Sequence, residues 1–176
     1  EMKTRLDAAE AHIHMEFPYF IEKAAPVTGS TGLMNYLCTF EGTSNGTDDF
    51  ILGVKAPATS LCPCSKEISA YGAHNQRCEI SARVRTRSML WIEDLVKIME
   101  AAASAPVYAV LKRPDEKFVT EQAFDNPKFV EDIIRDLAVA LDNEPLVEWY
   151  SIQSENFESI HNHNAYAMIE RDKRPA

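Results

Sequence analysis

The most reactive side chains of this sequence gather in one stretch, residues 59–77, which reads TSLCPCSKEISAYGAHNQR. Cys62 and Cys64 flank a proline, and His74 follows ten residues after Cys64. A thiolate and an imidazole are a soft and a borderline metal ligand, and a cysteine paired with a histidine can also be an activated nucleophile. We therefore expect a loop between two strands that carries a site of chemistry.

Further carboxylate and imidazole side chains fall in two other segments that we expect to be loops: Glu116, Glu158, His161 and His163. None of them lies inside a strongly periodic run. Three converging loops would offer thiolate, imidazole and carboxylate to one ion. A catalytic metal keeps an open position for water and lowers the pKa of that water, and neighbouring His and Glu residues can then move protons.

Two other sets of residues have competing interpretations. Cys38 and Cys78 lie in strand-like alternation, and we expect them to be small core residues. The arginines alternate along the polar face of one expected strand, at positions 83, 85 and 87. Such a series is either a solvated strand face or a phosphate cradle.

Composition narrows the class of protein. The chain has 176 residues, enough for one domain with a core, and a net charge of −9, which disfavours a general nucleic-acid binder. A local basic pocket would still accept a phosphorylated small substrate. No apolar run approaches the length that crosses a bilayer. Four cysteines do not suggest a secreted disulfide scaffold, so we expect a cytoplasmic protein with reduced thiols.

The elements expected to position these residues are mainly strands. Apolar alternation predicts strands over residues 17–21, 33–40, 50–56 and 78–84, with Asn45-Gly46 as a hairpin turn. A short strand is expected over 107–111, a loop over 112–126, and a last strand pair over 146–152 and 165–169.

Two helices complete the expected set. One covers residues 90–103, and the other begins at Pro127 with Asp125 or Asn126 as its cap and carries an apolar stripe from Phe129 to Leu141. Hairpin-joined strands with interspersed helices predict an α+β fold with a mainly antiparallel sheet and helices on one face.

Three long stretches together resemble the signature segments of the type IB GTP cyclohydrolases. They are residues 59–77, LKRPDEKFVTEQAFDNPKFVED at 111–132, and SENFESIHNHNAYAMIERDKR at 154–174. The resemblance implies a tunnelling fold (T-fold). It also implies hydrolytic opening of the imidazole ring of GTP at C8, with release of formate and formation of 7,8-dihydroneopterin triphosphate, the first step toward folate-type pterins.

The resemblance also assigns site residues. Cys62 matches the essential cysteine, and the other metal-site and catalytic residues correspond to His74, Glu116, Glu158 and His161. It implies a divalent cation, Mn²⁺, Fe²⁺ or Zn²⁺, held by Cys62, His74, Glu116 and His161, with Glu158 orienting water or a ligand.

Substrate contacts follow by the same resemblance. Glu131 matches the acidic residue that holds the guanine edge, although a carboxylate in the first turn of a helix is also favourable without any ligand. The candidate triphosphate contacts are Lys66, Arg77, Lys112 and Arg113.

The resemblance further implies an oligomeric barrel with active sites at subunit interfaces, and we expect a homotetramer. Residues 1–176 are expected to be a single tunnelling-fold catalytic region from which the family's N-terminal module is missing. No nucleic-acid or membrane partner is expected.

The sequence leaves three alternatives open. One is a same-fold, NADPH-dependent nitrile reductase of queuosine synthesis, which uses a cysteine nucleophile. Another is a cyclohydrolase that makes a cyclic phosphate. A third is a non-catalytic purine- or pterin-binding module with a structural metal, which predicts a closed four-ligand site.

Overall fold

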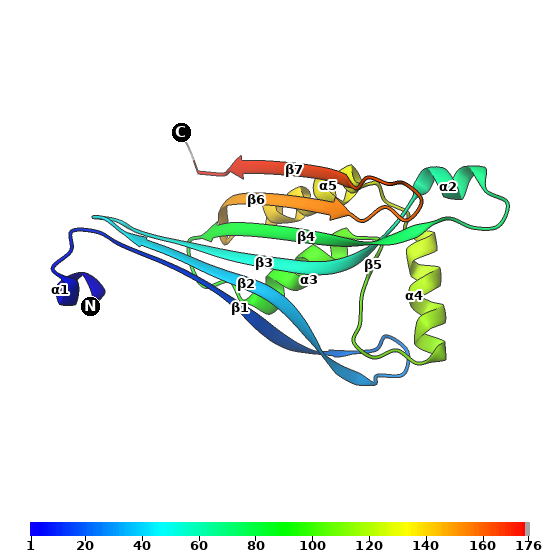
Figure 1. Cartoon of the computed structure of the whole chain (residues 1–176), viewed down its shortest axis with the longest axis horizontal. Coiled ribbons are helices and arrows are strands. Elements are labelled where there is room, and N and C mark those ends of the chain that lie inside the picture. The colour runs from blue at the N-terminus through cyan, green and yellow to red at the C-terminus, as the bar shows by residue number, and fades with distance from the viewer. Residues whose placement is uncertain (175–176) are drawn as a thin grey trace.

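Seven strands form one antiparallel sheet in the computed structural model, which describes residues 1–174 (Figure 1). Six of them follow the order β1-β2-β3-β4-β6-β7, and the short β5 pairs with β3. The strands are β1 (Ala11–Ala24), β2 (Thr31–Ser44), β3 (Asp48–Leu61), β4 (Asn75–Thr86), β5 (Ala105–Pro106), β6 (Val147–Asn156) and β7 (Ala165–Asp172). The expected α+β class with an antiparallel sheet is confirmed.

Two long helices cover one face of this sheet. The helices are α1 (Met2–Leu6), α2 (Pro63–Ile68), α3 (Ile92–Ala102), α4 (Arg113–Asp125) and α5 (Val130–Asn143). α3 packs on β3, and α5 packs on β6 and β7, so Figure 1 shows both on the same side of the strands. Within residues 1–174, no helix is long and apolar enough to span a membrane.

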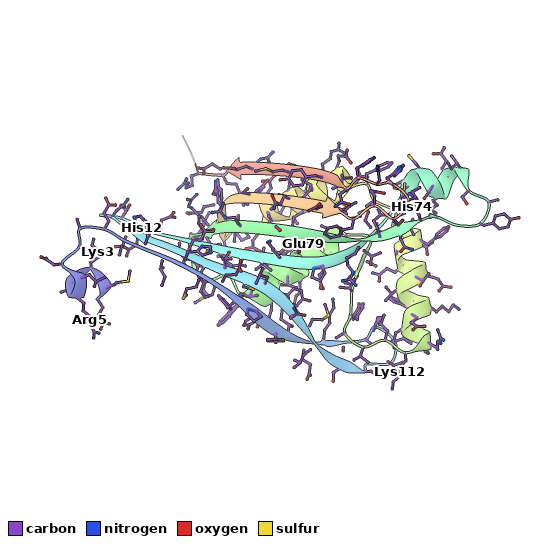
Figure 2. The ribbon with its side chains drawn as sticks, in the orientation of Figure 1. Lys3, Arg5, His12, His74, Glu79 and Lys112 are labelled. Atoms are coloured by element: carbon purple, nitrogen blue, oxygen red, sulfur yellow. The ribbon has the colours of Figure 1, made fainter. Side chains whose placement is uncertain are left out.

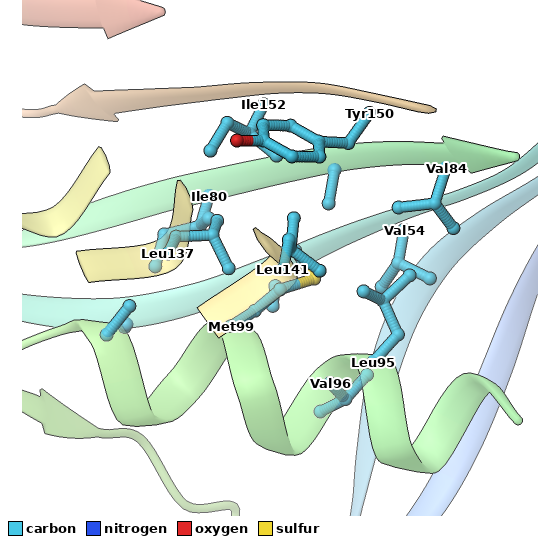
Figure 3. Close-up of a cluster of buried hydrophobic side chains, with 14 of the residues drawn as sticks. Val54, Ile80, Val84, Leu95, Val96, Met99, Leu137, Leu141, Tyr150 and Ile152 are labelled. Atoms are coloured by element: carbon cyan, nitrogen blue, oxygen red, sulfur yellow. The ribbon is translucent and has the colours of Figure 1, made fainter. Parts of the chain in front are cut away.

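The core lies between that sheet face and the two helices (Figure 3). Strand β4 alternates strictly, and its inward residues Cys78, Ile80, Ala82 and Val84 are each at most 1% exposed. The helical stripe predicted from the sequence supplies the other side, because α5 buries Ile133, Ile134, Leu137 and Leu141. Complete burial of one such aliphatic side chain contributes about 1.5–3 kcal/mol.

The two strand cysteines are core residues, as the alternation predicted. Cys38 and Cys78 are both fully buried. Burial raises the pKa of the Cys78 thiol to about 12 and that of the Cys38 thiol to about 11. Both are therefore protonated and unreactive near neutral pH.

The Asn45-Gly46 turn is also confirmed. Ser44 pairs with Asp48 across a three-residue connection between β2 and β3, and Gly46 has a φ of 113°. Residues with a side chain rarely adopt that backbone conformation, which explains why glycine stands at the tip of this hairpin.

The loop predicted over residues 112–126 is wrong, because this segment forms the helix α4. Pro114 stands in the first turn, and the Asp115 carboxylate accepts the backbone N–H of Lys112 at 2.9 Å, so the N-terminus is capped. Only Asp115 and Ala123 are buried. The helix therefore lacks the apolar period that reveals most helices in a sequence.

Two neighbouring boundaries also differ from the prediction. Residues 107–111 are not a strand, since β5 ends at Pro106. Helix α5 begins at Val130 rather than Pro127, because the Asp132 carboxylate accepts the N–H of Phe129 at 3.0 Å and caps the helix there. Phe129 itself is exposed.

Candidate active site at one end of the sheet

The reactive stretch joins the end of β3 to the start of β4 and holds Cys62 close to His74. The N–H of Cys62 donates to the carbonyl of His74 at 3.1 Å. Ser65 links the same two residues, since its hydroxyl donates to the Cys62 carbonyl at 3.1 Å and accepts the His74 N–H at 3.2 Å. The predicted loop is thus shorter than expected, because α2 begins at Pro63 and fixes the backbone around Cys62.

The imidazole of His74 meets the connection between β6 and β7. Its Nδ1 lies 3.0 Å from Oε1 of Gln76 and 3.3 Å from Oγ of Ser159. Ser159 directly follows Glu158, which is half-buried, and precedes the exposed His161 by two positions. The structure therefore brings the segment that carries Glu158 and His161 to the Cys62–His74 pair.

The start of α5 lies at the same end of the sheet. The N–H of Lys128 donates to the carbonyl of Leu61 at 3.0 Å, next to Cys62. The hydroxyl of Ser60 donates to the Lys128 carbonyl at 3.1 Å. Glu131, exposed in the first turn of α5, is therefore presented on the same side of the molecule as the cysteine.

Glu116 does not join this group within one chain. It lies in the first turn of α4, where it pairs with Arg113 at 2.8 Å. The last turn of α4 is the one near α2, because Nζ of Lys66 donates to the Phe124 carbonyl. Eight residues of helix separate Glu116 from Phe124, about 12 Å at 1.5 Å per residue. Figure 2 shows Lys112 and His74 near opposite ends of α4.

Among residues 1–174, no three His, Cys, Asp or Glu side chains are arranged to hold a metal ion together. The chain nevertheless supplies a thiol and an imidazole in adjacent positions, with a carboxylate and a second imidazole on the neighbouring segment. This donor set fits a borderline divalent cation in its chemistry, with further ligands needed to complete the coordination.

The phosphate-binding candidates lie at three places in the structure. Lys66 is engaged at the end of α4, where its ammonium also lies 4.2 Å from the centre of the Phe124 ring. Arg77 lines a polar cavity of about 420 Å³ together with Lys55 and Tyr108. Lys112 and Arg113 are exposed at the far end of α4, away from the Cys62–His74 pair.

The arginine series is a charged strand face. Ion pairs join Arg83 to Glu41 at 2.7 Å and Arg85 to Asp49 at 2.8 Å, and Arg87 lies 3.8 Å from Glu148. Because acidic partners already face these guanidinium groups, the structure favours the solvated face over the phosphate cradle.

Sequence reasoning missed a set of buried polar residues beneath the candidate site. They are Ser60, Gln76, Ser154 and Asn156, all at inward-facing positions of strands. The available signal was a polar residue where the alternation calls for an apolar one. Such residues are buried only with hydrogen-bond partners, so they mark a structured network.

Comparison with known proteins identifies the family. The sequence model of the family described as Type I GTP cyclohydrolase folE2 matches residues 1–167. The GTP cyclohydrolase FolE2 of Geobacter sulfurreducens is 60% identical over 176 residues, which is 100% of this chain and 68% of that protein. The GTP cyclohydrolase FolE2 of Geotalea uraniireducens is 58% identical over 173 residues, 98% of this chain and 64% of that protein.

A solved structure bears on the fold alone. Uricase from Arthrobacter globiformis has a TM-score of 0.51 at 10% identity, over 99% of this chain and 68% of that one. Uricase has the tunnelling fold, so the predicted T-fold is confirmed. The chain spans about two thirds of the length of the relatives it matches. The family model matches most of the chain, and both relatives are more than 50% identical to it over nearly its whole length. This chain therefore belongs to the type I GTP cyclohydrolase FolE2 family.

Proposed function

We propose that this chain is the catalytic region of a type IB GTP cyclohydrolase, with residues 1–176 forming a single tunnelling-fold unit. The reaction opens the imidazole ring of GTP at C8, releases formate and gives 7,8-dihydroneopterin triphosphate for folate-type pterins. Family membership supports the activity. The observation that carries it to named residues is the meeting of Cys62, His74 and the Glu158–His161 segment at one end of the sheet.

The proposed metal ligands are Cys62, His74, Glu116 and His161, with Mn²⁺, Fe²⁺ or Zn²⁺ as the cation. A cation bound there supplies Lewis acidity that makes water a nucleophile near neutral pH. Because C8 of a purine is a poor electrophile, the site must also protonate N7. Glu158 and His161, on the segment that Ser159 joins to His74, are the groups proposed to hold and deliver these protons.

Glu131 is the proposed anchor for guanine. Its carboxylate is exposed at the same end of the molecule as Cys62 and can accept from both N1–H and the exocyclic amine. Adenine lacks these two donors and would leave the carboxylate unpaired, so the contact selects the base. Lys66 and Arg77 on this side, and Lys112 and Arg113 from the far end of α4, are proposed to bind the triphosphate.

A homotetramer with active sites between subunits would reconcile the position of Glu116 with its proposed role. Within one chain Glu116 lies at the far end of α4, so the Glu116 of a neighbouring subunit would complete the site at Cys62. The sheet also ends in two edge strands, β1 and β7, which assembly into a barrel would cover.

We place this enzyme in the cytoplasm, where reducing conditions suit its four free thiols.

The relatives compared above carry the name GTP cyclohydrolase, which favours this activity over the nitrile reductase and the non-catalytic module.

The change Cys62→Ala tests the assignment, with Cys64→Ala as its matched control. We expect Cys62→Ala to lose both its metal and formate release, with an unchanged unfolding temperature of the metal-free protein. Cys64, exposed on α2, should be dispensable. Metal content and calorimetry would measure this. A Cys62→Ala protein that keeps metal and turnover contradicts the proposal, and one whose metal-free form no longer folds indicates a structural role instead.

A further inference from the structure

A chain of buried polar side chains runs from the interior of the sheet to His74. Ser60, Gln76 and Asn156 come from β3, β4 and β6 and are 1%, 7% and 2% exposed. Nδ2 of Asn156 donates to Oγ of Ser60 at 2.9 Å, and Nε2 of Gln76 lies 3.5 Å from the same oxygen. Groups this deeply buried must satisfy their hydrogen bonds with one another.

The donor and the acceptor of each hydrogen bond in this network follow from its end at the Lys128 carbonyl. The hydroxyl of Ser60 lies 3.1 Å from the backbone carbonyl of Lys128, which can only accept. Ser60 therefore donates its single hydrogen there and faces Asn156 and Gln76 as an acceptor. Asn156 agrees with this direction, because its Oδ1 is occupied by the hydroxyl of Ser154 at 3.3 Å.

Gln76 must consequently turn its amide nitrogen toward Ser60 and its carbonyl oxygen toward His74. That oxygen lies 3.0 Å from Nδ1 of His74 and can only accept, so Nδ1 carries the proton. In a neutral imidazole with a protonated Nδ1, the lone pair stands on Nε2. The hydroxyl of Ser159, 3.3 Å from Nδ1, can accept a share of the same hydrogen.

We infer that Gln76 is a positioning residue that holds His74 in the Nδ1–H tautomer and so reserves Nε2 for a divalent cation. The part of this inference that concerns the cation rests on the proposed function. Histidine ligands are generally fixed by an acceptor on their other ring nitrogen, and loss of that acceptor costs about 10- to 100-fold in metal affinity. The network beneath His74 provides this acceptor from the core of the sheet rather than from a mobile surface group.

The tautomer can be read directly in the metal-free full chain by nitrogen-15 NMR of labelled histidine side chains above pH 8. The chain has five histidines, and the His74→Gln variant assigns the signal. We expect Nδ1–H in the wild type and in Gln76→Glu, which keeps an acceptor. Gln76→Met, which fills the space without an acceptor, should shift His74 toward Nε2–H. A wild-type signal from Nε2–H would overturn the inference.

Binding of Mn²⁺ or Zn²⁺ alone, measured by competition with a chelator, provides the second readout. Gln76→Met should bind about 10- to 100-fold more weakly than the wild type, and Gln76→Glu should restore the affinity. Ser104→Ala is the control, because it removes an equally buried hydroxyl that accepts the N–H of Leu61 at 3.1 Å and is not hydrogen-bonded to Ser60, Gln76, Asn156 or His74. Unchanged affinity in Gln76→Met, or an equal loss in Ser104→Ala, contradicts the positioning role.

Two further outcomes separate this inference from the proposed function. A protein with the Nδ1–H tautomer and Gln76-dependent metal binding but no formate release would contradict the cyclohydrolase activity and leave the inference standing.

If Gln76→Met does not fold, Ser60→Ala provides the second variant, since it removes the acceptor that orients the Gln76 amide. A Ser60→Ala protein whose tautomer and metal affinity match the wild type would overturn the inference.

Discussion

At the scale of single residues, the four cysteines show how position decides reactivity. Cys38 and Cys78 face the core, where burial raises the pKa of each thiol far above neutrality. Cys62 lies where β3 ends and α2 begins, half-buried and bonded through its backbone to His74. The sequence distinguishes core cysteines from Cys62, because Cys38 and Cys78 lie in a strand alternation and Cys62 does not. No pattern in the sequence predicts the contact between Gln76 and His74.

The proposed role of Glu131 as the guanine anchor gives a prediction at this scale. Glu131→Gln should raise the KM for GTP by about 10- to 100-fold, because a hydrogen bond to a charged group contributes about 1.5–3 kcal/mol and the amide offers a donor where an acceptor is needed. Steady-state kinetics would measure it. Glu121→Gln, an exposed change on α4, is the control and should leave KM unchanged. A KM for Glu131→Gln equal to that of the control would remove Glu131 from the guanine site.

At the scale of elements, the sheet was predictable and α4 was not. The apolar alternation of β4 and the apolar stripe of α5 match the residues that each element buries. The sequence alone therefore predicts both elements. Helix α4 buries only a small apolar contact, formed by Ala123 and Val119. Its start is fixed by the Asp115 carboxylate, which accepts the backbone N–H groups of Val27 and Thr28. Such polar contacts join residues far apart in the chain and leave no periodic signal. The location of Glu116 was therefore beyond sequence reasoning, since it depends on where α4 lies.

Asp115 is the carboxylate that fixes α4, and it gives a pH-dependent prediction. It accepts from the Val27 N–H at 2.9 Å, the Thr28 N–H at 2.8 Å, the Thr28 hydroxyl at 2.7 Å and the Lys112 N–H. Burial alone would raise the pKa of Asp115, but these hydrogen bonds outweigh burial and hold the pKa well below the ordinary 3.8. The ionised group therefore stabilises the fold fully above about pH 4–5, and this contribution is lost as pH falls toward the lowered pKa.

Asp115→Asn should accordingly lower the urea midpoint at pH 7, because its amide turns a donor toward the N–H of Lys112. The gap from the wild type should narrow at pH 3. Urea unfolding at both pH values measures the gap. Asp125→Asn, an exposed residue in the last turn of the same helix, should match the wild type at pH 7. A gap that is absent at pH 7, or that widens in acid, would contradict the role assigned to Asp115.

The contact between α5 and the sheet gives a prediction about stability. Leu137→Ala should lower the free energy of unfolding by about 2–5 kcal/mol, because Leu137 is completely buried and its loss leaves a cavity. Val139→Ala, on the same helix but 59% exposed, should change it by at most about 0.5 kcal/mol. Equal effects of the two changes in denaturant unfolding would show that α5 does not pack as described.

At the scale of the whole molecule, one chain does not bring all the candidate site residues together. The Cys62–His74 pair and the Glu158–His161 segment lie together, while Glu116 stands at the other end of α4. Sequence resemblance named all of these residues, but it could not say which of them one chain brings together. That division depends on tertiary placement and, in our proposal, on a neighbouring subunit.

Mixing two inactive variants tests the interface proposal. Cys62→Ala and Glu116→Gln should each be inactive alone, and chains unfolded and refolded together should recover part of the wild-type activity. Recovery follows because a mixed oligomer contains some sites that join an intact Cys62 to an intact Glu116. Light scattering on the same samples should give the mass of four chains. A tetramer without any recovery would place both residues in the same subunit's site.

GTP turnover by metal-stripped protein, after separate addition of Mn²⁺, Fe²⁺ and Zn²⁺, tests the cyclohydrolase assignment. Formate is measured together with the fluorescence of the oxidised pterin, and Cys62→Ala serves as the inactive control. We predict that wild-type protein releases formate and forms pterin only with added metal, while Cys62→Ala does neither. Absence of both products with every metal, in this chain and in one extended to the length of its FolE2 relatives, would contradict the assignment.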